Sequence, residues 1–474
     1  METPEHLLIF TRWDNVYMRI ELGKSLKRKF PDSKLQFATV NYWAHLQVEN
    51  AGEHSLYLLD RMQRCDPNAI PPNRKEALDK AIYEETGATL NMMTLGERAR
   101  PRNGKKVEEM RDRHLVVLDE IVQSKTLMVH ETCDSMVYWL ASSLVLSRGG
   151  WNFSFISCGI PSNTVLGMRT AWTRWLASGA LSPDITVAEQ QQILAEPVAK
   201  RMGYMNQKTM ENPLDWFRYQ FMVFRYCLID AWHGSLYWSF KAFIPNLIGK
   251  LWRRVKICLP RKATIRNERE VETLGAPFIY FPLQMEPEAS ILGYSPWFRS
   301  QMEAIRILCQ SMPATWKILV KENPKMAGAR PMGYYKKIES MPGVELVDIR
   351  VPTYPLLKHA KAVGAISGTA TFEGRLLGKP TFTFGSPPFH TLLTDSDVAG
   401  RARMRDWFDH LLSESQPALT DHDFDDWKKS VFQARGSMFW QGAYRGIDAS
   451  EENVAMYVAF ILDVLEKPRF TSTP

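Results

Sequence analysis

Short apolar runs alternate with stretches of helical periodicity in the first part of the chain. Residues 7–10 are apolar, residues 17–29 place apolar side chains at helical spacing, and residues 34–40 return to a strand-like pattern. The alternation resumes over residues 107–156. Strands that alternate with helices predict a parallel sheet with helices on both faces. We therefore expect an N-terminal α/β domain over residues 1–190.

A second alternation of the same kind lies further along the chain. Its strand-like runs are residues 278–283, 316–320, 344–348, 362–366 and 381–384. The pattern predicts a second doubly wound α/β domain over residues 261–415. Helix-like stretches at residues 425–435 and 452–465 follow, and residues 416–474 are expected to pack back on the first domain.

The segment between the two domains, residues 191–260, is expected to be helical and is rich in aromatic and basic side chains. Examples are Trp216, Arg225, Trp232 and Trp252. One interpretation is an interdomain layer whose aromatic side chains pack inward. The other is an interfacial helix that docks on anionic lipid, because Trp together with Lys and Arg suits the headgroup zone.

Length and charge narrow the possible functions. A chain of 474 residues exceeds the size at which one hydrophobic core usually divides, which agrees with two domains. The net charge of +7 favours an anionic partner, such as a phosphate-bearing donor or an acidic membrane face, but is far from a nucleic-acid-binding signature. No Cys-x-x-Cys pair indicates a zinc or redox site.

The sequence also bears on location. No signal peptide or bilayer-spanning apolar run is recognised. We therefore expect a cytoplasmic protein, with the aromatic and basic segment as a possible peripheral contact to the inner face of the cell membrane.

Small residues connect a buried strand-like run to a helix-like stretch at Ser367, Gly368 and Thr369. The free N–H groups and positive end of such a helix form an anion site, and glycine lets a phosphate approach the backbone. Ligands of open parallel sheets bind beyond the carboxyl ends of strands, where this turn is expected. Glu373, one helical turn further, could accept hydrogen bonds from ribose or sugar hydroxyls. The alternative is an ordinary turn with a Ser/Thr cap.

Two other predicted strands of this domain also end in polar residues. One is followed by Lys321, Asn323 and Pro324, and the other by Gln284 and Glu288. Lys321 could meet a phosphate, while Gln284 and Glu288 could bind a base or ribose edge. A solvated lysine and ordinary loop polarity are the alternatives. Because these strands belong to one predicted sheet, we expect the clusters to converge on one crevice.

Segments 280–288, 319–324 and 366–380 resemble the ordered motifs of the capsule polysaccharide biosynthesis family, which includes the Kdo transferases of capsule and lipopolysaccharide assembly. The resemblance covers residues 275–390. In it, Gln284 and Glu288 correspond to the family's Q-x-x-x-D motif, and Asn323 with Pro324 to its H-P motif. Glutamate thus replaces aspartate and asparagine replaces histidine. Asparagine can still donate a hydrogen bond to phosphate but carries no charge.

This resemblance implies a GT-B-like α/β fold of two doubly wound, Rossmann-like domains with additional helical segments. It implies a glycosyltransferase whose nucleotide-sugar donor, with CMP-Kdo favoured, is held mainly by the C-terminal domain without a metal or other cofactor. The acceptor would be a growing surface polysaccharide or a glycolipid. The alternatives are a nucleotide-sugar epimerase or hydrolase on the same fold, and a non-catalytic scaffold of a membrane-associated polysaccharide assembly complex.

Sugar transfer needs a base for the acceptor hydroxyl or a nucleophilic carboxylate. In GT-B enzymes this group usually comes from the first domain. Asp14 follows the first predicted strand, while Glu131 and Asp134 follow the strand over residues 126–129 and are favoured for that position. The alternative is that Asp134 and Thr132 merely cap the next helix. Arg12 could neutralise the donor phosphate.

Motifs of other nucleotide-binding and hydrolytic enzymes are missing. The sequence lacks G-x-x-x-x-G-K-[ST], G-x-S-x-G and H-E-x-x-H, and its opening loop lacks G-x-G-x-x-G. These absences disfavour a P-loop ATPase, the common serine hydrolases, a zinc protease and a dinucleotide oxidoreductase.

Overall fold

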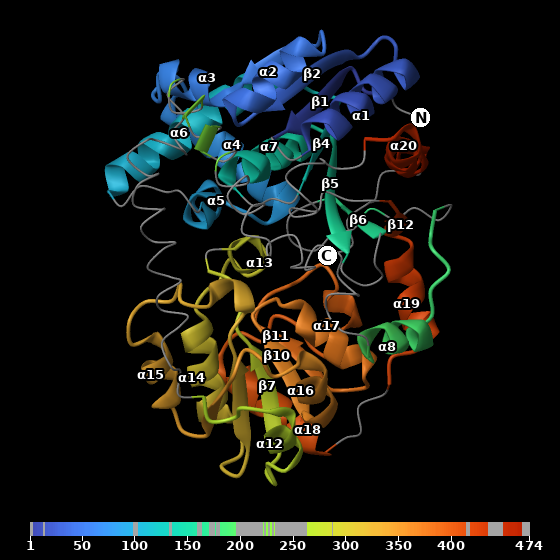
Figure 1. The fold of residues 1–474 in the computed structure, drawn as a ribbon. Helices are drawn as coiled ribbons and strands as arrows, with labels where there is room; N and C mark the ends of the chain where they lie inside the picture. Colours follow the sequence, from blue (N-terminus) through green and yellow to red (C-terminus); the bar gives the residue numbers. More distant parts are fainter. Residues whose placement is uncertain are drawn as a thin grey trace. The chain divides into compact units, whose positions relative to one another are not determined.

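The structure is a computed structural model. It describes residues 3–12, 15–97, 103–131, 135–158, 164–169, 176, 181–195, 263–286, 288–413, 418–434 and 449–466, together with single positions between 221 and 232. The predicted helical segment 191–260 therefore lies almost entirely outside the described residues. Residue contacts divide the chain, drawn in Figure 1, into two units. The first comprises Met1–Asp184, Glu196–Ile244 and Lys428–Pro474, and the second Ile185–Ala195 and Pro245–Trp427.

The first unit contains a seven-stranded sheet in the order β12-β6-β5-β4-β1-β2-β3. Neighbours from β3 to β5 are parallel, whereas β6 is antiparallel to β5 and β12 to β6. The strands are β1 (His6–Thr11), β2 (Lys34–Thr39), β3 (Ser55–Tyr57), β4 (Thr126–Glu131), β5 (Trp151–Cys158), β6 (Thr164–Met168) and β12 (Val431–Gln433).

Helices cover both faces of this sheet because its central strands are apolar on both sides. Leu8 and Phe10 of β1 pack into the core that contains α7, while Leu7 and Ile9 pack into the core that contains α1 and α20. This alternation follows from the pleat of a strand. The helices of the unit include α1 (Val16–Lys29), α2 (Tyr42–Asn50), α3 (Leu58–Arg64), α4 (Pro72–Thr86), α5 (Leu90–Gly96), α6 (Gly104–Ile121), α7 (Met136–Ser147) and α20 (Glu451–Glu466).

The second unit contains a five-stranded sheet in which every neighbouring pair is parallel, in the order β11-β10-β7-β8-β9. Its strands are β7 (Phe278–Pro282), β8 (Lys317–Lys321), β9 (Val344–Val347), β10 (Ala362–Ala365) and β11 (Thr381–Thr383). Its helices include α8 (Val187–Ala195), α12 (Glu268–Glu272), α13 (Ala289–Leu292), α14 (Gln301–Ser311), α15 (Tyr334–Glu339), α16 (Thr353–His359), α17 (Thr369–Leu376), α18 (Arg401–Ser413) and α19 (Asp421–Lys428).

Close packing of α17 on the sheet fixes the helix that carries the predicted anion site. A Cβ atom on Gly374 of α17 would lie 2.7 Å from Cγ2 of Val363 in β10. Glycine therefore lets the helix approach the strand more closely than any other residue would allow. Because only three residues connect β10 to α17, the N-terminus of α17 lies just beyond the end of β10.

The two sheets confirm the predicted α/β fold of two doubly wound, Rossmann-like units. Numbered within each unit, the five parallel strands have the order 3-2-1-4-5 in both sheets, so the order reverses between β1 and β4 and between β7 and β10. Such a switch point is where ligands of doubly wound folds bind. Among the described residues, no helix is both long and apolar enough to cross a membrane.

Two segments differ from the predicted elements. The predicted helix 425–435 is wrong in its second half, because Val431 and Phe432 are apolar and form β12 at the edge of the first sheet. Helix α19, placed by the prediction with the C-terminal segment, lies mainly in the second unit, as does α8. The N–H of Val187 in α8 donates to Oδ1 of Asp421 in α19 at 2.7 Å, which joins the two helices.

Candidate functional site

The switch point of the second unit joins two loops that the sequence singled out. Gln284 follows β7 and Ser367 follows β10, and both are buried. Oε1 of Gln284 accepts a hydrogen bond from the N–H of Ser367 at 2.9 Å, and its Nε2 donates to Oγ of Ser367 at 3.3 Å. The side chain of Gln284 thus fixes the start of the turn that leads into α17.

The N-terminus of α17 has the donors of an anion site. Within the part of the chain that the structure describes, the N–H groups of Gly368, Thr369 and Ala370 have no hydrogen-bond partner. Gly368 is half-buried and Thr369 is exposed. The N–H of Thr371 donates to the carbonyl of Gly368, which closes the first turn. Free N–H groups at the positive end of a helix bind phosphate.

Lys321 ends β8 as a buried cation, with only 6% of its surface exposed. Its Nζ donates to Oγ1 of Thr353 at 3.3 Å. Burial lowers the pKa of Lys321 to about 8, while the carboxylates of Glu373 and Asp348 act in the opposite direction. Glu373 is itself buried in α17. The carboxylate of Glu373 and the ammonium of Lys321 therefore interact electrostatically.

The hydroxyl of Thr353 does not cap α16. Thr353 is the first residue of that helix, Pro352 occupies the N-cap position, and no side chain caps it. Thr353 therefore has no capping role in α16. Its hydroxyl accepts from Lys321 instead, because a buried ammonium needs an acceptor.

Asn323 and Pro324 form the turn that follows β8. Oδ1 of Asn323 accepts from the N–H of Lys325 at 3.0 Å, and Pro324 opens the 3-10 helix η3 (Pro324–Met326). Glu288 lies at the start of the segment that leads into α13, where its carbonyl accepts from the N–H groups of Ile291 and Leu292. Burial lowers the pKa of Lys325, and the carboxylate of Glu288 opposes that shift.

Arg330 is a residue of this region that the sequence motifs did not indicate. Its guanidinium is buried and donates to both carboxylate oxygens of Glu322 (2.8 and 3.0 Å), to Oε2 of Glu286 at 2.6 Å and to the carbonyl of Gln284 at 2.5 Å. The hydroxyl of Tyr335 also donates to Glu322, at 2.8 Å. The sequence does contain a signal for such a cation, because Glu286 follows β7 and Glu322 follows β8, and buried carboxylates need a cation nearby.

The switch point of the first unit holds a second polar cluster. Nη2 of Arg12 donates to Oε2 of Glu131 at 2.6 Å, and Nδ2 of Asn15 donates to Oε1 at 2.5 Å. Oδ1 of Asn15 in turn accepts from the N–H of Arg12 at 3.0 Å and from the hydroxyl of Thr11 at 3.1 Å. Glu131 is buried at the end of β4, so these contacts orient its carboxylate.

Of the three predicted catalytic carboxylates, only Glu131 is described, because Asp14 and Asp134 lie outside the described residues. Arg12, predicted to neutralise a donor phosphate, forms an ion pair with Glu131. The buried Arg19 supports the same strand end, since its Nη2 donates to the carbonyl of His130 at 3.3 Å. Burial lowers the pKa of Arg19, and Glu131 opposes that shift.

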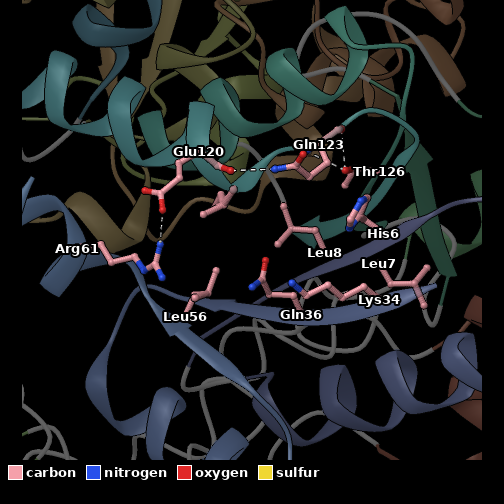
Figure 2. Close-up of a pocket in the computed structure, with 11 residues that line it drawn as sticks. His6, Leu7, Leu8, Lys34, Gln36, Leu56, Arg61, Glu120, Gln123 and Thr126 are labelled. Carbon is pink, nitrogen blue, oxygen red and sulfur yellow. Dashed lines mark hydrogen bonds and ion pairs between the residues drawn. The ribbon is translucent and has the colours of Figure 1, made fainter. Parts of the chain in front are cut away.

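Two hollows of the first unit lie at the opposite edge of its sheet. Figure 2 shows the smaller one, of about 230 Å³, with His6, Lys34 and Thr126 at the first positions of β1, β2 and β4. Arg61 forms an ion pair with Glu120 at its rim, at 3.2 Å. The other hollow, of about 720 Å³, shares His6. Because ligands of doubly wound sheets bind at the carboxyl ends of strands, these hollows are separate from the candidate site.

Both units thus have the anatomy of ligand-binding doubly wound domains, with buried charged groups at each switch point. Residues 226–404 match the family described as Capsule polysaccharide biosynthesis protein, which confirms the predicted resemblance over this part of the chain. The matched residues include Gln284, Lys321, Ser367 and Glu373. No curated protein matches the chain in sequence.

Solved structures that resemble the chain include a beta Kdo 2,7 transferase, KpsC, of Thermosulfurimonas dismutans, with 12% identity, a TM-score of 0.34, and 98% of this chain and 100% of that chain covered. A UDP-GlcNAc 2-epimerase from Neisseria meningitidis bound to UDP-GlcNAc has 11% identity, a TM-score of 0.27, and coverage of 96% and 99%. HepE of Anabaena in complex with UDP-glucose has 8% identity, a TM-score of 0.29, and coverage of 97% and 98%.

Proposed function

We propose that this chain is a glycosyltransferase that moves a sugar from a nucleotide-activated donor to a growing surface polysaccharide or glycolipid. The observation that carries the proposal is the N-terminus of α17 at a topological switch point, with unbonded N–H groups at Gly368, Thr369 and Ala370 in the described structure. The family match to capsule polysaccharide biosynthesis spans the same residues and supports a surface polysaccharide as the product class.

The second unit would hold the donor. Its phosphate would accept hydrogen bonds from the N–H groups at the start of α17, with the ammonium of Lys321 as the nearby cation. Glu373 would accept from a ribose or sugar hydroxyl. We favour a CMP-sugar such as CMP-Kdo, following the resemblance to the Kdo transferases, and propose that no metal takes part.

In the transfer, a bond forms between the acceptor oxygen and the anomeric carbon while the bond from that carbon to the phosphate oxygen breaks. The electron pair of the broken bond leaves with the nucleotide, and N–H groups fixed before the reaction stabilise the charge that develops there. A base takes the proton of the acceptor hydroxyl. We propose Glu131 for this role, because a carboxylate has about four acceptor sites and only two described donors occupy those of Glu131.

The first test is a thermal-shift and calorimetric screen of CMP, UDP, GDP and their sugars. A ligand that binds only the folded chain at about 100 times its dissociation constant adds about 2.7 kcal/mol of stability. We expect a cytidine nucleotide to give the largest shift, and Gly368→Val to remove it.

The outcomes separate the alternative functions. Release of an epimer or free sugar without an acceptor would identify an epimerase or hydrolase instead. Failure to bind any nucleotide, together with tight binding to anionic vesicles, would identify a scaffold. Transfer to an acceptor saccharide, with no reaction in its absence, supports the glycosyltransferase.

A further inference from the structure

Arg330 connects the loop after β7 to the loop after β8. Its Nη2 donates to the carbonyl of Gln284, and its Nε and Nη2 donate to the two carboxylate oxygens of Glu322. Its Nη1 donates to Glu286, two residues beyond Gln284. A single buried side chain therefore sets the separation between two loops at the carboxyl edge of the sheet.

The chain of contacts continues from Arg330 to the proposed phosphate site. The backbone of Gln284 is held by Arg330 and by Gln301, whose Oε1 accepts its N–H at 2.5 Å and whose Nε2 donates to its carbonyl at 3.1 Å. The side chain of Gln284 then holds both the N–H and the hydroxyl of Ser367. Ser367 directly precedes the N–H groups of α17, so Arg330 is linked to them through Gln284.

We propose that Arg330 is a positioning residue of the donor site, acting through Gln284 on the turn at Ser367. This inference rests on the proposed function. It differs from a general stabilising role because it predicts that the effect of Arg330 on nucleotide binding depends on the side chain of Gln284. Arg330 itself has no role in contacting the donor.

The geometry requires a guanidinium. Only a planar fork can donate to both oxygens of Glu322 through Nε and Nη2 while Nη2 also reaches the carbonyl of Gln284 and Nη1 reaches Glu286. Lysine keeps the charge, but its three N–H donors start from one nitrogen and do not span the acceptors that the three nitrogens of Arg330 reach. Arg330→Lys therefore loosens the loop after β7 but still provides a cation for the buried carboxylates.

The test is a double-mutant cycle on the full chain with CMP as the probe and UDP in parallel. Arg330→Lys and Gln284→Ala are measured singly and together by calorimetry. We expect each single variant to weaken binding about 10- to 100-fold, the loss expected when one hydrogen bond to a charged group is broken. The double variant should bind within about twofold of Gln284→Ala alone, because Arg330 then has no side chain to position.

Arg306→Lys is the matched control. Arg306 also lies in the second unit and pairs with a glutamate, Glu303, with Nε to Oε2 at 2.8 Å, but it is exposed and has no contact with Gln284. Its substitution should leave binding unchanged. If Arg330→Lys fails to fold, Glu286→Gln replaces it in the cycle, because Glu286 is only partly buried and its change weakens one contact of Arg330.

The outcomes are distinct. If the fold-losses of nucleotide affinity in Arg330→Lys and Gln284→Ala multiply in the double variant, the two residues act independently. That result would overturn the inference and leave Arg330 as a stabilising residue only. Wild-type affinity in Arg330→Lys would also overturn it. A wild-type chain that binds neither CMP nor UDP overturns the proposed function instead, which separates the two failures.

Discussion

Gly368→Ala tests the phosphate site with little perturbation of the fold. Gly368 has φ −79° and ψ 146°, an extended conformation that any residue adopts. A Cβ atom placed there would lie 3.4 Å from Cβ of Ala365 and 3.5 Å from Cγ and Cδ of Gln284, which are ordinary contact distances. The native backbone therefore accepts alanine, and the variant should fold.

The expected stability change follows from the unfolded chain. Replacing glycine by alanine at a compatible position stabilises a protein by about 0.4–1 kcal/mol, because the unfolded chain loses freedom. In a unit of this size that is about 1–4 °C in Tm. Gly104→Ala in α6 is the control, since its φ is not positive and its added Cβ would contact nothing. It should stabilise the chain without changing nucleotide binding.

The effect on binding should have the opposite sign. We expect a methyl group on Gly368 to hinder the approach of a phosphate to the N–H groups of Gly368 and Thr369. Losing one hydrogen bond to a charged group costs about 1.5–3 kcal/mol, or about 10- to 150-fold in Kd. Calorimetric titration with CMP and UDP measures the loss, and thermal melting measures the stability. Unchanged affinity in Gly368→Ala and in the bulkier Gly368→Val would refute the assignment of this turn as the phosphate site.

Three further substitutions test the other groups. Glu131→Gln should lower kcat about 10²- to 10⁴-fold while the donor Kd changes little; if transfer survives at the normal rate, the base is elsewhere, with Asp14 the next candidate. Because burial lowers the pKa of Lys321 to about 8, its positive charge is lost as the pH rises through that value. The Kd for CMP should therefore rise between pH 8 and pH 10, and Lys321→Met should remove this pH dependence; a flat wild-type profile would contradict the role of Lys321. Glu373→Ala should raise the donor KM about tenfold or more by removing a charged acceptor, and wild-type kinetics would exclude it from the donor site.

The fold was largely predictable because its signals are local and repeated. Buried parallel strands are apolar on both faces, so β1, β4, β7 and β10 were visible as short apolar runs between helical stretches. The edge strand β12 was missed because its three residues follow a helix-like stretch after only two intervening residues. Whether Val431 and Phe432 extend a helix or join a sheet depends on β6, which lies far away in the sequence.

The candidate site was predictable only where a residue stands directly at a strand end. Lys321, Gln284 and Ser367 each have that position, and the structure places them at the carboxyl edge of the second sheet. The side chains that these residues contact could not be predicted, because the contacts join residues far apart in the sequence. Thr353 accepts from Lys321 across 32 positions, and Gln284 joins Ser367 across 83 positions. No local pattern encodes such pairs.

The polar clusters at the two switch points occupy equivalent positions in their units but differ in charge. In each unit the strand order reverses beside the first strand. The connections that follow the first and fourth strands therefore run to opposite sides of the sheet and leave a gap between these two strand ends. In the first unit this gap is spanned by the ion pair of Arg12 with Glu131, and in the second by the neutral contact of Gln284 with Ser367. A neutral link leaves the positive end of α17 uncompensated, which favours an anionic ligand there. An oriented carboxylate at the other switch point instead suits proton transfer from an acceptor hydroxyl.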